Sequence, residues 1–411
     1  MIFTPTRKAG LDRLQAFLPQ AGRHYANSRN YDDGVPEDGP RRNVSQLSPW
    51  LHAGLISETQ VINSVLSAHS PDASEKFIAE VSWRIYFKGY LEQRPTIWSA
   101  YCEQRDAAFA RLRSNSNLAD SYDTAINGKT GIAAFDLWAR ELVETAYLHN
   151  HARMWFASIW IFTLKLDWTL GADFFLRHLI DADAASNTLS WRWIGGLHTK
   201  GKTYLARADN IAKYTANRSN GPLRAEGLAE EADALVETVE HNRATPNLPA
   251  PLQLADLRHA YALIVHDEAA SHAPLDLPHP PALVIAAARP EARSPRPIGS
   301  HARSFASEAV RKGASIAAHA FDCEERAWTS EDDLAAILSA AGLKRIVLPY
   351  LPTGWTRDAL KPELEPLFLN GHAIEVLNEL SRATWPLARA GFFGFKKKAS
   401  RILSELGIMG I

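Results

Sequence analysis

Apolar residues recur three and four positions apart through the first half of the chain. The clearest of these stretches are residues 10–18, 57–66, 75–91 and 135–148. Such spacing places the apolar side chains on one side of a helix. The longest apolar run, residues 154–166, includes Lys165 and is typical of a buried core helix. The pattern therefore predicts an all-helical domain over residues 1–218.

The pattern changes after that domain. Residues 219–251 are acidic and contain proline, which favours one exposed helix followed by a linker. Short apolar runs then alternate with helical stretches as far as the C-terminus. The expected strands are residues 261–266, 281–288, 314–321, 344–350 and 372–377. The expected helices are residues 300–313, 330–342, 357–371 and 392–408.

Alternating strands and helices imply a parallel sheet. We therefore expect an α + α/β protein, in which a smaller, Rossmann-like α/β domain at residues 252–411 follows the helical one. Ser304 is an expected helix start and Gly313 an expected helix stop. The chain contains neither a GxGxxG nor a P-loop motif.

Composition narrows the setting. The 45 basic residues nearly balance the 46 acidic ones, so a polyanionic partner has to be met by a local basic patch. Cys102 and Cys323 are too few for a cysteine-ligated cluster or zinc site and argue against a disulfide framework. No stretch approaches the roughly 20 apolar residues of a membrane helix, and the N-terminus has no signal pattern. We expect a soluble, cytoplasmic monomer.

Residues 179–193, LIDADAASNTLSWRW, join two aspartates, an asparagine and two tryptophans. If Asp181 and Asp183 are buried they need partners, and Arg153 is a candidate. A structural ion pair is the simpler interpretation. Several of the 12 tryptophans cluster nearby: Trp155, Trp160, Trp168, Trp191 and Trp193. Core packing is the simpler explanation, and the alternatives are stacking on a flat ligand or a base and electron transfer between indoles.

Three further stretches carry weaker signals. Basic residues interleaved with tyrosines favour a phosphate-contacting surface or, equally, a solvated face: Lys200, Lys202, Arg207, Lys213 and Arg218. Residues 43–54 are typical of a helix cap and leave phosphate binding as the minor alternative. His149 and His151 are two positions apart, which on a helix does not place them on one face, so we expect no metal site there.

Taken in order, the motifs match one family. They are Tyr25-Ala-Asn-Ser-Arg29, VSQLSPWLHAGLIS, FIAEVSWRIYF, TGIAAFDLWAREL, HNHARMWFAS, LDW and DADAASNTLSWRW. Residues 10–218 thereby resemble the FAD-binding helical domain of DNA photolyases and cryptochromes. The resemblance implies FAD as cofactor. The residues that it places along FAD are Tyr25, Arg29, Ser45, Leu47, Ser48, Arg153, Asp181, Asp183 and Asn187.

The resemblance also assigns roles. It implies that Arg153 pairs with Asp181 beside the flavin, that Asp183 faces the flavin N3 edge and that Asn187 lies near N5. It makes Trp191 the electron donor nearest the flavin and Trp168 the next one. The third, outer tryptophan of the family has no clear counterpart. Its candidate replacements are Trp98, Trp138 and Tyr122.

The substrate residues of the cyclobutane-dimer type carry over as well. The resemblance implies that Glu80 accepts a hydrogen bond from the lesion and that Trp83 and Trp193 flank a flipped-out pyrimidine pair. The other residues expected in this pocket are Arg84, Asn150 and Met154. His151 stands where that type usually has an arginine.

The resemblance thus implies a deoxyribodipyrimidine photolyase, which uses light and reduced FAD to split cyclobutane pyrimidine dimers in damaged DNA. The modest net charge favours single strands. A cryptochrome-like photoreceptor without repair activity, a (6-4) photolyase and a redox flavoprotein are the alternatives.

Two departures from the family stand out. The stretch GGLHTKGKTYLARADNIAKYT, after residue 194, resembles a subgroup of bacterial photolyase-like proteins. The antenna domain that normally precedes the flavin domain is missing from its usual place. Residues 347–377 resemble the middle of that domain, which implies a relocated, shortened version. Whether it binds an antenna chromophore stays open, and a structural or docking domain is slightly favoured.

Overall fold

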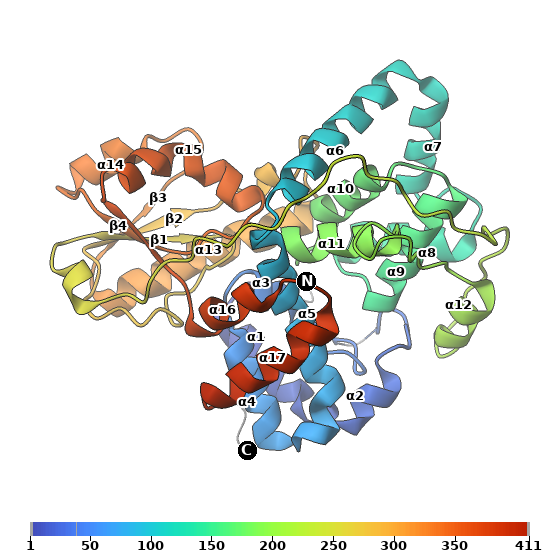
Figure 1. Ribbon diagram of the computed structural model, residues 1–411, viewed down its shortest axis with the longest axis horizontal. Coiled ribbons are helices and arrows are strands. Elements are labelled where there is room, and N and C mark those ends of the chain that lie inside the picture. The colour runs from blue at the N-terminus through green and yellow to red at the C-terminus, as the bar shows by residue number, and fades with distance from the viewer. Residues whose placement is uncertain (1–2, 38, 409–411) are drawn as a thin grey trace.

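The computed structural model describes residues 3–37 and 39–408. Its helical half begins with α1 and ends with α12. The helices are α1 (Arg7–Phe17), α2 (Arg23–Ser28), α3 (Ser48–His52), α4 (Glu58–Ala68), α5 (Pro71–Glu92), α6 (Thr96–Ser114), α7 (Ser116–Ile126), α8 (Ala133–Thr145), α9 (Asn150–Ser158), α10 (Trp168–His178), α11 (Ala184–Ile194) and α12 (Ala208–Tyr214). The long helix α5 runs through the middle of the molecule (Figure 1).

Local sequence explains where several of these helices start. The Ser57 hydroxyl accepts a hydrogen bond from the backbone N–H of Gln60, whose side chain accepts one from the Ser57 N–H in return, forming a capping box at α4. The Ser70 hydroxyl caps α5 by accepting the backbone N–H of Ala73, and proline occupies the first helical position. Asp183 caps α11 through the backbone N–H of Ser186. This last cap matters for the site, because it fixes one of its carboxylates.

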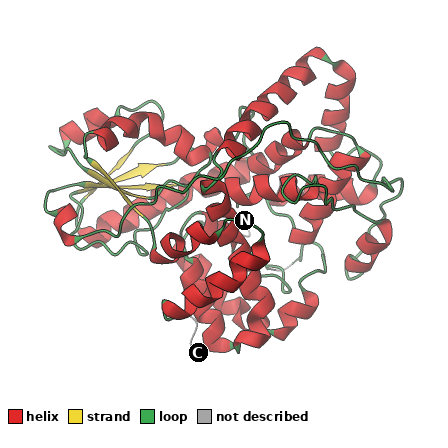
Figure 2. Ribbon diagram, viewed as in Figure 1, coloured by secondary structure: helices red, strands yellow, loops and turns green. Residues whose placement is uncertain are grey.

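The second half is built on a five-stranded parallel sheet in the order β3-β2-β1-β4-β5. The strands are β1 (Ala262–His266), β2 (Leu283–Ala287), β3 (Glu324–Ala327), β4 (Ile346–Pro349) and β5 (Ala373–Val376). Helix α13 (Ser300–Phe321) covers one face, and α14 (Leu334–Ala340) and α15 (Trp355–Leu369) cover the other (Figures 1 and 2). The expected α + α/β class is confirmed.

Alternate residues of β1 divide between two cores, as the period of a strand requires. Leu263 and Val265 belong to the core that contains α13, whereas Ala262 and Ile264 belong to the core under α14 and α15. The order of strands reverses between β1 and β4. The loops at the carboxyl ends of these strands therefore border the position where open α/β sheets hold ligands.

Several local predictions were wrong, and one strand was missed. Residues 314–321, predicted as a strand, are the second half of α13, which starts at Ser300 rather than Ser304 and continues through Gly313. Gly313 is there for packing, because a Cβ on it would lie 1.6 Å from the carbonyl oxygen of Ala270. Residues 219–251 form no helix, and follow the helical half as extended chain (Figure 2). The edge strand β3 was missed because its four residues, Glu-Glu-Arg-Ala, are all exposed.

The chain returns to the helical half after β5. Helices α16 (Glu379–Thr384) and α17 (Phe392–Glu405) lie beside α5 (Figure 1). The Gln93 side chain donates a hydrogen bond to the carbonyl of Trp385 (2.7 Å), and the Tyr86 hydroxyl donates one to the carbonyl of Ala390 (2.7 Å). The domain limits at residues 218 and 251 stay a prediction. No helix in the described ranges is long and apolar enough to cross a membrane.

Candidate functional site

The segment between α10 and α11 carries two buried carboxylates. Asp181 Oδ2 accepts a hydrogen bond from Arg153 Nη2 at 3.0 Å, while Arg153 Nε donates to the carbonyl of Leu148. Burial opposes ionisation of Asp181, but Arg153 and the Ser48 hydroxyl outweigh it and hold its pKa below the ordinary value. Asp181 Oδ1 is buried without a hydrogen-bond partner among the described residues.

Asp183 is fully engaged. Its Oδ1 accepts a hydrogen bond from the backbone N–H of Ser186 at 2.7 Å. Its Oδ2 lies 2.9 Å from Lys88 Nζ and 3.1 Å from Arg84 Nη1. Burial would raise the pKa of this carboxyl, but Lys88 and Arg84 hold it well below its usual range. Arg84 also pairs with Glu58 at 2.9 Å. The expected roles of Asp183 beside the flavin and of Arg84 at the substrate stay predictions.

Helix α2, the loop before α3 and the start of α3 contribute the residues expected along the FAD phosphates. Tyr25 is buried and packs edge-on against Phe17 and Phe77. The Ser45 hydroxyl accepts the N–H of Leu47 at 3.4 Å, and Ser48 is the first residue of α3. Arg13 holds this loop through its backbone carbonyls, including that of Ser45 at 2.7 Å. The loop is therefore fixed, although its role toward phosphate stays a prediction.

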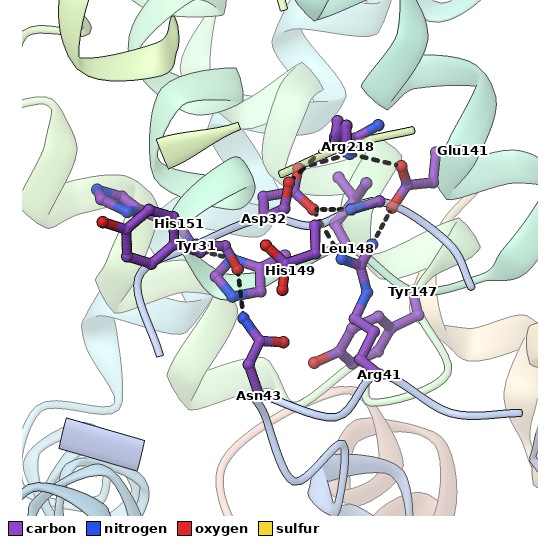
Figure 3. A network of polar contacts seen from close by, with 12 residues as sticks. Tyr31, Asp32, Arg41, Asn43, Glu141, Tyr147, Leu148, His149, His151 and Arg218 are labelled. Carbon is purple, nitrogen blue, oxygen red and sulfur yellow. Dashed lines mark hydrogen bonds and ion pairs between the residues drawn. The ribbon is translucent and has the colours of Figure 1, made fainter. Parts of the chain in front are cut away.

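A network of buried ion pairs anchors the start of this loop to α8 (Figure 3). Asp32 accepts hydrogen bonds from Arg41 (2.7 Å), Arg218 (2.6 Å) and the indole N–H of Trp138 (3.1 Å). Glu141 accepts from Arg41 at 2.6 Å and from Arg218 at 3.1 Å. Burial would raise the pKa of Asp32, but the two guanidinium groups lower it. Arg218, one of the basic residues considered for phosphate contact, is thus buried and paired.

The two histidines of the HxH pair make different contacts. His149 is buried and accepts the backbone N–H of His151 through Nδ1 at 3.2 Å. The His151 ring stacks on Trp155 with ring centres 4.1 Å apart, and its Nδ1 lies 3.0 Å from the carbonyl oxygen of Asn30. These contacts are structural ones.

His149 makes stability depend on pH. Burial lowers its pKa from 6.5 to about 3, so the unfolded chain takes up a proton that the folded one excludes. The stability that neutral His149 gives is present above pH 6.5 and is lost as the pH falls toward 3. Between pH 7 and pH 5, we expect this group alone to remove about 2 kcal/mol. Urea unfolding at both values checks this, and an equally steep loss in His149→Gln would contradict it.

Three of the residues expected around the lesion, Glu80, Trp83 and Trp193, each contact a different residue of the protein. Glu80 lies 3.1 Å from Arg29, and its side chain is 38% exposed. Trp83 stacks face to face on Phe392 of α17, with ring centres 3.7 Å apart and an interplanar angle of 10°. Trp193 stacks instead on Tyr204. Asn150 is exposed and Met154 is half-buried, both on α9.

The structure groups the aromatic residues into two chains. Trp191 is buried, and its ring centre lies 6.3 Å from that of Trp160, which is 6.0 Å from Tyr122. Separately, Trp168 lies 5.7 Å from Tyr101, and Tyr101 lies 5.2 Å from Trp98.

The ends of these chains have different surroundings. The indole N–H of Trp98 donates to Asp358 of α15 at 2.7 Å. Trp138 belongs to neither chain and stacks on Trp155. Asn187 donates its side-chain N–H to the carbonyl of Ala172 at 2.9 Å, which fixes the amide on α11.

These residues fit a polar cofactor better than a metal ion. Asp181 Oδ1, Arg29 Nε and the Trp191 indole N–H are buried without a hydrogen-bond partner in the described part of the chain, and such groups need one. FAD carries donors and acceptors that would satisfy them. His52, Asp183 and Glu268 offer three ligand atoms within 4.8 Å of one another, but the Lys88 ammonium already contacts both carboxylates.

Sequence reasoning missed Asp32, Arg41, Glu141, Lys88 and Glu268. Each is a charged residue that is buried only because of partners far along the chain, such as Glu141, which lies 100 positions from Arg41. No short motif contains these pairs. The place of Glu141 on α8, one turn after Leu137 and Trp138, was the only signal in the sequence.

Residues 77–220 match the family of the FAD binding domain of DNA photolyase. A deoxyribodipyrimidine photo-lyase of Streptomyces griseus is 31% identical over 219 residues, covering 48% of this chain and 46% of the relative. That of Agrobacterium fabrum is 32% identical over 199 residues, covering 47% and 39%. The chain spans less than half the length of these curated relatives.

Two solved structures resemble about half of the chain. A bacterial class III photolyase from Agrobacterium tumefaciens is 26% identical with a TM-score of 0.38, covering 52% of this chain and 43% of its own. A cryptochrome of Synechocystis is 22% identical with a TM-score of 0.40, covering 53% and 46%. The family model and the curated relatives confirm that the helical half resembles the FAD-binding domain of DNA photolyases.

Proposed function

We propose that the helical half binds FAD and that the protein repairs cyclobutane pyrimidine dimers in DNA, preferentially single-stranded, under illumination. The observation that carries this proposal is the Arg153–Asp181 pair, inside the segment that matches the FAD-binding family. The buried Asp181 Oδ1 has no hydrogen-bond partner among the residues that the structure describes. When bound, reduced FAD would supply a light-excited electron that splits the cyclobutane ring and is then returned.

The protein's own residues would bind and orient both molecules. Arg153 holds Asp181 ionised, so that Asp181 Oδ1 is an acceptor for a flavin N–H. Asn187, fixed on the carbonyl of Ala172, would present its amide oxygen toward N5. Glu80 would accept a hydrogen bond from a pyrimidine. To do so, its carboxylate would give up its contact with Arg29. Burial of Asp181 and Asn187 would keep water away from the flavin atoms beside them.

The role of the substrate residues can be separated from cofactor binding. We expect Glu80→Ala and Trp193→Ala to lower the repair rate severalfold while FAD stays bound. Glu80 supplies a hydrogen bond, and Trp193 replaces part of the stacking that a flipped-out base loses. Repair of dimer-containing oligothymidine, followed by thymine absorbance, measures the effect. Glu103→Ala, an exposed position on α6, is the control, and normal repair by both variants would refute the pocket.

The stack of Phe392 on Trp83 means that a base reaches this ring face only after α17 gives way. We expect Phe392→Ala to tighten binding of a dimer-containing oligonucleotide severalfold, because an aromatic pair contributes about 1 kcal/mol. Fluorescence anisotropy measures this binding. The neighbouring Phe393 is 84% exposed, so Phe393→Ala is a matched control. Unchanged or weaker binding by Phe392→Ala would remove Trp83 from the substrate site.

The same stack supports a second candidate, a cryptochrome-like photoreceptor without repair activity. A covered Trp83 and a buried Arg218 leave fewer groups for DNA than the sequence alone indicated. In that case illumination would reduce bound FAD and change the binding of a partner, while dimers in oligothymidine would persist. A turnover assay with cyclobutane and (6-4) lesions distinguishes dimer repair, (6-4) repair and a photoreceptor that repairs neither lesion.

A further inference from the structure

Two loops at the carboxyl edge of the parallel sheet contact residues 179–184, the segment that carries Asp181 and Asp183. After β2, Arg293 donates to the carbonyl of Leu179 at 3.1 Å. After β4, the indole N–H of Trp355 donates to the carbonyl of Ala182 at 3.0 Å. A Cβ on Gly354 would lie 2.6 Å from that of Ala184, so the backbone there approaches as closely as glycine allows. The α/β half is therefore packed directly on this segment.

The loop after β1 packs on the helical half beside this segment, and it carries a charged side chain, Glu268. The N–H of Ala270 donates to the carbonyl of Ala53 at 2.8 Å, which places the loop against the end of α3. Next to it, Glu268 Oε2 lies 2.7 Å from Lys88 Nζ, the ammonium that also contacts Asp183 Oδ2 at 2.9 Å. Glu268 and Lys88 are separated by 180 positions in the chain.

The three charged side chains that are in contact here, Asp183, Lys88 and Glu268, are all buried. The exposed fractions are 2% for Asp183, 5% for Glu268 and 10% for Lys88. Charges in such surroundings interact more strongly than at the surface. One ammonium therefore divides its attraction between a carboxylate of the helical half and one of the α/β half. Arg84 contacts Asp183 and Glu58, and the His52 ring lies 3.7 Å from Asp183 and 3.9 Å from Glu268.

We propose that Glu268 is a positioning residue of the flavin site, which sets the charge balance at Asp183 through Lys88, so that the α/β half tunes the bound flavin. This inference rests on the proposed binding of FAD near Asp183. With Glu268 ionised, Lys88 is shared between Glu268 and Asp183, so Lys88 neutralises less of the negative charge on Asp183. Without it, Lys88 pairs with Asp183 alone.

Two variants with opposite expected effects test the proposal. Glu268→Gln keeps the shape but removes a negative charge, so it should shift the midpoint potential of bound FAD to more positive values by favouring the electron-rich reduced form. Lys88→Gln removes a positive charge and should shift the potential to more negative values. A purely structural role would move both in the same direction or move neither. Glu308→Gln, on the surface of α13, should match the wild type.

The measurement is spectroelectrochemical titration of the FAD-loaded full chain, with thermal unfolding as a check on folding. Opposite shifts support the proposal, and either variant alone is sufficient if the other does not fold. Glu268→Asp retains the charge and should restore a near wild-type potential. FAD-loaded variants with the wild-type potential would overturn this inference alone. A wild-type chain that binds no added FAD would overturn the proposed function together with it.

Discussion

Arg41→Met is expected to lower the free energy of unfolding by about 3 kcal/mol, because it removes one cation from a buried network and leaves Asp32 and Glu141 to share Arg218. The exposed fraction of the Arg41 side chain is 3%, and those of its two partners are 0% and 5%, so water cannot replace the lost hydrogen bonds. Urea unfolding followed by circular dichroism measures the change.

The chain offers a matched control in the neighbouring residue. Arg42 is exposed, so Arg42→Met should change stability by less than about 0.5 kcal/mol. Glu141→Gln added to Arg41→Met should recover part of the loss, because it removes one of the uncompensated charges. Equal stability of the two arginine variants would mean that the network does not stabilise the loop before α3.

Trp191→Phe is expected to abolish most of the light-driven reduction of bound FAD while leaving FAD in place. Trp191 is the buried indole on α11, and phenylalanine preserves its packing but is much harder to oxidise. Blue illumination with an external reductant, followed by the loss of oxidised-flavin absorbance, measures the rate. Trp328→Phe is the control, because Trp328 is equally buried but belongs to the core of the α/β half.

Two further variants trace the path beyond Trp191. The family resemblance makes Trp168 the next donor, whereas the ring distances place Trp160 beside Trp191. If electrons pass through Trp168, then Trp168→Phe and Trp98→Phe should both slow photoreduction, since Tyr101 connects their rings. A loss in Trp160→Phe alone would instead assign the path to Trp160 and Tyr122. Unchanged photoreduction in Trp191→Phe would contradict both paths.

The sequence predicted best what depends on local pattern. Apolar periodicity located the helices around residues 57–66 and 75–91, and short apolar runs located four of the five strands. Both signals lie in neighbouring positions, because such helices bury one face and strands such as β1 and β4 are buried on both faces. Gly313 was misread because its reason lies in the carbonyl of Ala270, 43 positions away, rather than in its neighbours. The extended course of residues 219–251 likewise depends on tertiary contacts such as Arg192 with Glu237.

The candidate site divides in the same way. Its motif residues lie within short stretches, and the structure pairs Arg153 with Asp181 across 28 positions. The sequence could not predict the contacts that the second half makes with the helical half, because these contacts depend on how the two halves pack together. The stack of Phe392 on Trp83 and the contact of Glu268 with Lys88 join positions that no motif relates. Both change what the motif residues are free to do.

The most direct test of the central claim is the absorption spectrum of the purified protein, reduced and then illuminated with oligothymidine that carries cyclobutane dimers. The account predicts flavin bands and a light-dependent recovery of thymine absorbance. Flavin bands without recovery would support the photoreceptor instead of repair. A protein that shows no flavin bands, even after incubation with FAD, would contradict the claim that the segment around Asp181 is a flavin site.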